Sequence, residues 1–115
     1  MGVASTIQRM ISAFDPDERS ERAYALMETM RMIVTQTLVP KVSGGRLGVR
    51  EWMRFDDQVR DKLMDMDFKE WPTEVQRMLP FYGQTMARSA EIYFEAGDID
   101  RRTYIMLSSA TGAAA

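Results

Sequence analysis

Hydrophobic residues recur at helical spacing in the first third of the chain. Residues 6–14 carry apolar side chains three and four positions apart, and Ser5 opens a Ser-x-x-Gln pattern typical of a helix start. Asp15-Pro16 then supplies an N-cap and a first helical residue, followed by a second apolar stripe. The pattern therefore predicts a short helix over 6–14 and a long helix from 16 to about 35.

A change to alternating hydrophobic and polar positions predicts a β-hairpin over about 36–55. The turn falls at Ser43-Gly44-Gly45, where glycine tolerates positive φ. One face of the second strand is apolar apart from a single carboxylate and carries Leu47, Val49, Glu51, Met53 and Phe55, while the other carries Arg50, Trp52 and Arg54. Because an isolated hairpin is marginally stable in water, we expect the long preceding helix to cover it.

The remainder of the chain has the pattern of a helical bundle. Asp56 or Asp57 caps its first helix, and Thr85 starts a later one. Pro80, which has no N–H to donate, and Gly83 are expected to end the helix between them. Residues 108–115 are small or polar with nothing to bury, which predicts a disordered tail.

Composition limits the chemistry that this chain can perform. Its 115 residues suit one domain, since single domains run about 100 to 150 residues. It contains no Cys and no His, which excludes disulfides, Cys/His zinc sites and Ser-His or Cys-His catalytic pairs. The net charge of -2 provides no overall field that attracts nucleic acid or anionic membranes. The charged first segment does not have the pattern of a signal peptide, so we expect a cytoplasmic location.

Few patterns indicate a small-molecule site. The phosphate-binding spacing G-x-x-x-x-G-K-[ST] does not occur, and we interpret Gly44-Gly45 as a hairpin turn. The carboxylate pairs Asp56/Asp57 and Asp65/Asp67 are of a type that holds metals or shares a proton. Helix capping and solvated helix faces explain both pairs better, so we assign no catalytic, cofactor-binding or metal-binding residue.

Five residues are candidates for a protein interface. Arg50 and Arg54 flank Trp52 on the outward face of the predicted hairpin, a combination that suits a protein docking surface and also stacks on bases. We favour a solvated sheet face or one that contacts protein, and we expect no direct nucleic-acid partner. Met32 and Met64 fall off the apolar stripes of their predicted helices. They are either adaptable contacts at a mobile subunit interface or two exposed methionines with no role.

A series of short motifs resembles, in order and spacing, the late part of the motor domain of PilT-like ATPases, the hexameric pilus-retraction and type IV secretion motors. The family has a TIDRIIDVF helix, an SQTL strand, a Gly-Gly-Arg turn, a HEIM strand, and the strings GMQTL and KGLIS. The similar segments here are residues 4–14, 35–38, 44–46, 50–53, 83–86 and 96–99. Arg50 stands where the family has His. The Arg-Glu-Trp variant looks closer to the Dot/Icm (DotB-like) and conjugative-transfer (TraJ-like) branch than to pilus retraction.

The family's AIRNLIRE signature is similar to the segment that follows the predicted hairpin. Arg60 and the acidic Asp65 match it in kind, whereas Asp61 and Lys62 depart from it. The resemblance therefore implies a retraction or coupling motif formed by Gln58, Val59, Arg60, Asp61, Lys62, Leu63, Met64 and Asp65.

The resemblance also implies an architecture: an α+β, mostly helical fragment of a RecA-like motor domain. Residues 1–55 would be the terminal piece of the ATPase core, and residues 56–107 a C-terminal helical bundle. In the family, the Walker A, Walker B and His-box segments precede the helix that residues 4–14 resemble. ATP and Mg would therefore be bound by the intact motor, and we expect no ATPase activity from this chain alone.

The implied partners are the remainder of the motor domain, neighbouring subunits of a hexameric ring and inner-membrane components of a secretion system. Such a piece would couple nucleotide state to movement and subunit contact, in the cytoplasm and peripheral to the bacterial inner membrane. The residues leave one alternative open. This is a free-standing small helical adaptor or regulator that binds a protein partner through its Arg/Trp hairpin.

Overall fold

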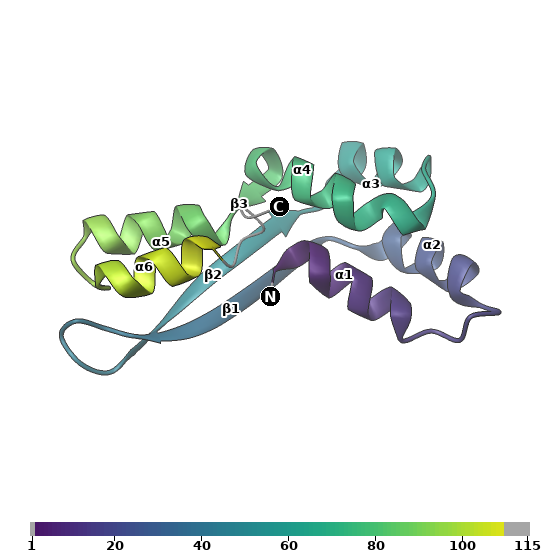
Figure 1. Ribbon diagram of the computed structural model, residues 1–115. Helices are drawn as coiled ribbons and strands as arrows, with labels where there is room; N and C mark the ends of the chain where they lie inside the picture. Colours follow the sequence, from purple (N-terminus) through teal and green to yellow (C-terminus); the bar gives the residue numbers. More distant parts are fainter. Residues whose placement is uncertain (1, 110–115) are drawn as a thin grey trace.

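The computed structural model describes residues 2–109, which form six α-helices, a short 3-10 helix and a three-stranded antiparallel sheet (Figure 1). The molecule is elongated, 49 × 27 × 24 Å, and a long hairpin runs along it. This confirms the expected class, which is mostly helical with one hairpin. The elements are α1 (Val3–Ser12), α2 (Arg19–Thr29), β1 (Met32–Pro40), β2 (Arg46–Arg54), α3 (Asp57–Met64), η1 (Phe68–Glu70), α4 (Trp71–Tyr82), β3 (Gly83–Gln84), α5 (Met86–Glu95) and α6 (Arg101–Ser108).

The hairpin is present, but it begins earlier than the pattern predicted. β1 starts at Met32, so the prediction that a helix continues to about residue 35 is wrong. Ile33 and Val34 fit a helical stripe with the preceding apolar residues, yet β-branched side chains also favour strands. Antiparallel pairing of β1 with β2 places Ile33 opposite Met53 in the interior and turns Val34 to the exterior.

The starts of the first two helices also differ from the prediction. α1 begins at Val3 rather than near residue 6, because Gly2 is its N-cap and the Ser5 hydroxyl accepts a hydrogen bond from the Gly2 N–H (3.0 Å). α2 begins at Arg19, and the Asp15-Pro16 signal instead opens a turn in which the Glu18 N–H donates to the Asp15 carbonyl (3.0 Å). The Asp15-Pro16 pattern, which is typical of a helix N-cap, therefore marks the turn that precedes α2 and not the start of the helix itself.

The later helix boundaries follow the predicted signals more closely. The side chains of Asp56 and Thr85 cap α3 and α5, as expected, by accepting hydrogen bonds from backbone N–H groups three residues on. Pro80 lies inside α4, which continues to Tyr82, and Gly83 is the C-cap that ends the helix, as predicted. Ser108 lies in α6 rather than in a tail, and residues 110–115 of the predicted tail lie outside the described residues.

Two hydrophobic clusters lie side by side along the hairpin. The large cluster joins α1–α4 to one half of the hairpin through Val3, Ala4, Ile7, Ile11, Ala23, Met27, Ile33, Met53, Phe55, Val59, Leu63, Trp71, Val75, Met78 and Leu79. The small cluster joins α5 and α6 to the half nearer the turn through Val39, Val49, Met86, Ala90, Ile99 and Leu107. The domain boundary expected at residue 55 remains a prediction, and each cluster contains residues from both sides of it.

The cover of the hairpin differs from the expectation. α1, α4 and α5 pack on its buried face, while α2 packs against α1, α3 and η1. Trp71 anchors that packing: its indole Nε1–H donates to the Leu63 carbonyl (2.6 Å), and its ring meets Tyr24 and Phe68 edge to face. Aromatic contacts therefore hold α2 against η1 and α4, and the hairpin is covered by α1, α4 and α5.

The strand β3, which the sequence pattern did not predict, allows one test of the fold. A Cβ at Gly83 would stand 1.9 Å from the Trp52 carbonyl oxygen, so Gly83→Ala must push two paired backbones apart. We expect a loss of about 1–3 kcal/mol in the free energy of unfolding, measured by urea denaturation.

Gly48→Ala is the matched control, because it adds the same methyl group to β2 and its nearest neighbours are side-chain atoms of Gln36, which is exposed and free to turn away. Its cost should stay within about 0.5 kcal/mol. Equal costs for the two variants would show that the close β2–β3 approach is unimportant.

Candidate functional site

The hairpin presents a continuous outer face that bears four of the five candidate interface residues. The register pairs Met32 with Arg54, Val34 with Trp52, and Arg50 with a glutamine, so these side chains project from one side of the sheet. Arg50 and Arg54 are exposed and Trp52 is half-buried. The structure thus brings Met32, Arg50, Trp52 and Arg54 together, although Met32 reaches this surface from a strand and not from a helix.

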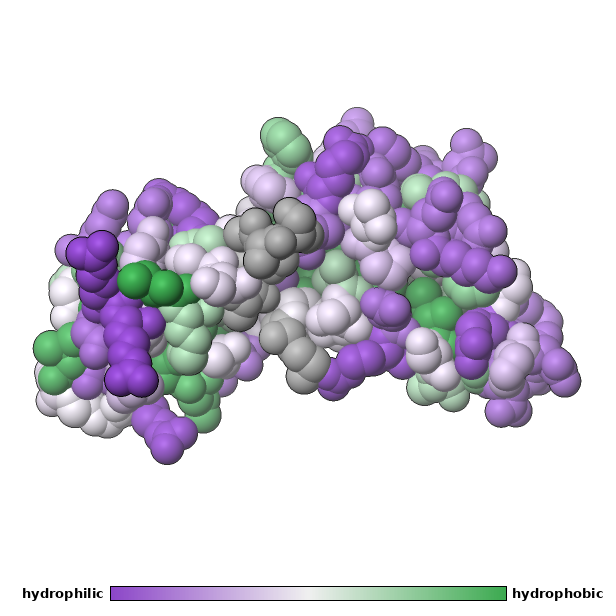
Figure 2. Space-filling view, in the orientation of Figure 1, coloured by the Kyte–Doolittle hydropathy of each residue, from purple (hydrophilic) through white to green (hydrophobic). Residues whose placement is uncertain are grey.

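This outer face combines apolar surface with positive charge. Met32, Val34 and Leu38 on β1 are between 50% and 55% exposed. Arginines 46, 50 and 54 project from β2, and no outward position of either strand carries a carboxylate. Hydrophobic side chains also reach the surface near the hairpin turn and α6, as Figure 2 shows. The outer face of the hairpin therefore suits a protein partner that presents both apolar and acidic groups.

Met64 does not belong to this face. It lies at the end of α3 and packs, partly buried, against the large cluster, so its part in a subunit contact stays a prediction. α3 packs against α2 and is also bonded to α4 through Lys62 and the Leu63 carbonyl. Because α2 and α4 lie on two sides of α3, they cover positions of this helix, such as Met64, that its single apolar stripe predicts to be solvated.

The segment expected to form a coupling motif, residues 58–65, is almost entirely α3. Val59 and Leu63 bury its inner side in the large cluster. Gln58 and Lys62 line a shallow surface hollow against α4, and Asp61 and Asp65 are exposed. The motif residues therefore divide between packing, a polar contact with α4 and solvent, and they do not converge on one pocket.

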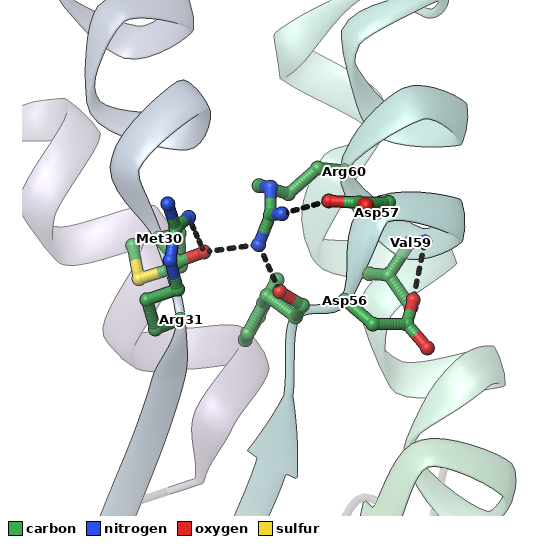
Figure 3. Close-up of polar contacts among 7 residues, drawn as sticks. Met30, Arg31, Asp56, Asp57, Val59 and Arg60 are labelled. Carbon is green, nitrogen blue, oxygen red and sulfur yellow. Dashed lines mark hydrogen bonds and ion pairs between the residues drawn. The ribbon is translucent and has the colours of Figure 1, made fainter.

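Arg60 is the exception within this segment, because its side chain is directed inward and only 15% exposed. Its Nη1 donates to the Met30 carbonyl (2.9 Å) and to the Phe55 carbonyl, and its Nη2 contacts the Asp57 carboxylate (Figure 3). One guanidinium thus joins the place where the chain leaves α2 to the place where it leaves β2. Arg60 fixes the two ends of the hairpin relative to each other.

A second polar group connects α3 to α4. Glu74 accepts from Lys62 (2.9 Å) and from the Arg77 Nε (3.0 Å), and its side chain is 13% exposed. The hydrogen bond from Arg77, followed by that from Lys62, lowers the pKa of Glu74 from 4.5 to about 2. Glu74 is therefore charged over the whole range in which most proteins stay folded.

Sequence reasoning missed the role of Glu51, although it placed this residue on the apolar face. Glu51 is 1% exposed; its Oε2 accepts from the Val3 N–H (2.8 Å) and its Oε1 from the Met86 N–H (3.0 Å). A lone carboxylate in an alternating apolar stripe was the available signal, because a buried charge requires partners.

The described residues offer no metal site of three or more Asp, Glu, His or Cys side chains. The carboxylates expected to serve as caps do so in part: Asp56 caps α3 and Asp67 accepts from the Lys69 N–H (2.9 Å). In residues 2–109, no helix has the length and apolar character needed to cross a membrane.

Removing the guanidinium of Arg60 should weaken the fold. Arg60→Met leaves the Met30 and Phe55 carbonyls without this donor, and we expect a loss of about 1–3 kcal/mol in the free energy of unfolding by urea denaturation. Arg88→Met is the control, since Arg88 pairs with Glu91 at the surface and should cost less than about 1 kcal/mol. A loss no larger for Arg60→Met than for the control would contradict the clamp.

Glu74 should make stability depend on pH. Because its pKa is lowered in the folded state, its contribution is complete above about pH 4.5 and is lost as the pH falls toward about 2. Glu74→Gln should flatten part of the acid-side fall in thermal denaturation midpoints. The part due to Asp100, whose pKa is lowered by a hydrogen bond from the Thr103 backbone, should remain. An unchanged profile in Glu74→Gln would refute this assignment.

Solved structures of known proteins share this architecture. No family model matches the chain. The X-ray structure of the Legionella pneumophila ATPase DotB superposes with a TM-score of 0.89 and 34% identity, covering 96% of this chain and 30% of that one. The Yersinia pseudotuberculosis ATPase DotB gives 0.87 and 32%, covering 93% and 28%.

The PilT proteins are more distant. The pilus retraction motor PilT with bound ADP has a TM-score of 0.76 and 20% identity over 93% of this chain and 29% of that one, which supports the fold alone. The type IV pilus retraction ATPase PilT of Pseudomonas aeruginosa is 29% identical over 62 residues, 54% of this chain and 18% of that protein. The chain spans less than a third of the length of these relatives. Its sequence and fold together identify it as a PilT/DotB-like type IV ATPase segment.

Proposed function

We propose that the chain acts as the C-terminal part of a hexameric type IV secretion or conjugation motor ATPase, where it couples nucleotide state to movement and subunit contact. The match to DotB over 96% of the chain, at 34% identity, is the observation that carries this proposal. In it, ATP and Mg bind to the parts of the motor that this chain does not match, because the sequence has no phosphate-binding loop.

The outer face of the hairpin is the surface through which this part would contact the remainder of the motor or a neighbouring subunit. Three half-exposed apolar side chains on β1 favour a partner that removes them from water. The arginines of β2 favour a partner surface with carboxylates, which would fix the orientation of docking. A location at the cytoplasmic face of the inner membrane, beside secretion-system components, belongs to the same proposal.

The first test is to read the frames that flank the gene for a phosphate-binding loop, in frame or in a neighbouring gene. The chain is then produced together with that product, and ATPase activity and assembly mass are measured by light scattering. Arg50→Glu combined with Arg54→Glu should lower assembly affinity at least about tenfold, because both charges face the partner.

Arg101→Glu combined with Arg102→Glu is the matched control, since it makes the same charge change on exposed positions of α6. The control should assemble and hydrolyse ATP as the parent does. Equal losses in both double variants would remove the hairpin face from the proposal. Finding no phosphate-binding loop in any flanking frame would favour the adaptor function instead.

A further inference from the structure

Glu51 occupies the point where the two hydrophobic clusters meet. Its carboxylate accepts the N–H of Val3, the first residue of α1, and the N–H of Met86, the first residue of α5. α1 belongs to the large cluster and α5 to the small cluster. Each oxygen is therefore committed to a helix from a different cluster, and the positive ends of both helix dipoles converge on one negative charge.

Few other polar contacts described in the structure cross this boundary. The Ser89 hydroxyl of α5 donates to the Arg50 carbonyl and accepts from the Gln84 side-chain amide (2.7 Å). Both contacts lie within two residues of Glu51 or of Met86 along the chain or strand, so they reinforce the same point. Covalently, the clusters are joined by the two hairpin strands and by the short β3.

The fit around the carboxylate is tight on the α1 side. A Cβ at Gly2 would stand 2.2 Å from Glu51 Oε2. Gly2 has an extended backbone, φ -123° and ψ -172°, that other residues also adopt, so its requirement for glycine comes from the carboxylate and not from backbone strain. The position of α1 and the position of the carboxylate thus determine each other.

We propose that Glu51 is a positioning residue that couples the two clusters: it fixes the orientation of α5 and α6 relative to α1, and displacement of α1 shifts that orientation. The physical basis is that one rigid, buried acceptor serves both helices, so neither helix start moves without loss of a hydrogen bond to a desolvated charge. Without this link, the hairpin, the β2–β3 pairing and the Ser89 contacts alone hold the two clusters together, and we expect the clusters to reorient by bending of the hairpin.

The test measures the distance between the clusters directly. The chain has no native Cys, so Glu28→Cys on α2 and Arg102→Cys on α6 accept spin labels at two exposed positions. Pulsed electron spin resonance should give one narrow distance distribution in the parent. In Glu51→Gln, whose amide keeps the shape but turns an NH₂ toward one of the two donors, the distribution should broaden at least twofold.

Two further variants make the test independent of the charge change. Gly2→Ala keeps the carboxylate but displaces it, and should broaden the distribution as Glu51→Gln does. Glu95→Gln removes an exposed carboxylate from α5 and should leave the distribution unchanged. Amide hydrogen exchange of Leu63 and Leu107 reports whether the large and the small cluster each stay folded.

Broadening with both clusters protected from exchange supports the coupling. An unchanged distribution in Gly2→Ala and Glu51→Gln overturns it. Loss of exchange protection in both clusters of Gly2→Ala also overturns it, because Glu51 would then be an ordinary core residue on which global stability depends. Should Glu51→Gln fail to fold, Gly2→Ala alone decides between these outcomes.

Discussion

A carboxylate placed inside a hydrophobic sheet face must be given hydrogen-bond donors, and this requirement at Glu51 organises the molecule. The donors it receives are the first backbone N–H groups of α1 and α5, which helices leave unsatisfied in any case. One group thereby removes the cost of burying a charge and supplies a partner at two helix starts. The consequence is geometric, because two helices that are far apart in the sequence must begin at the same point of the hairpin.

The hairpin then serves as the axis on which the rest is arranged. Its inner face holds two separate clusters, and its outer face keeps apolar and arginine side chains in solvent. Arg60 ties the open ends of the strands together, and Glu51 ties the helices at the middle. Near the turn, the contact is of another kind, from the Val42 N–H to the Asp98 carbonyl (2.9 Å). Polar contacts thus hold the hairpin at three successive positions: at its open end, at its middle and near its turn.

Sequence periodicity predicted the two faces of β2 because each side chain there alternates with its neighbours, and the buried and exposed positions follow that alternation. It failed where two periods fit the same residues, as at Ile33 and Val34, since only the pairing with β2 decides between strand and helix. The side-chain caps of Asp56 and Thr85 were predictable because donor and acceptor are three residues apart. The partners of Glu51 lie 48 and 35 residues away, a distance that no local pattern covers.

The contrast between local and long-range contacts also bears on the resemblance to PilT-like ATPases. The short motifs that resemble those of PilT-like ATPases include the segment around Glu51 and the segment around Arg60, and both residues make long-range polar contacts in the structure. The fold is shared with DotB at a TM-score of 0.89 and 34% identity. The outward side chains of the hairpin lie outside the two hydrophobic clusters that hold this fold together. The apolar and arginine side chains of this face therefore stay available for the partner contact that we propose.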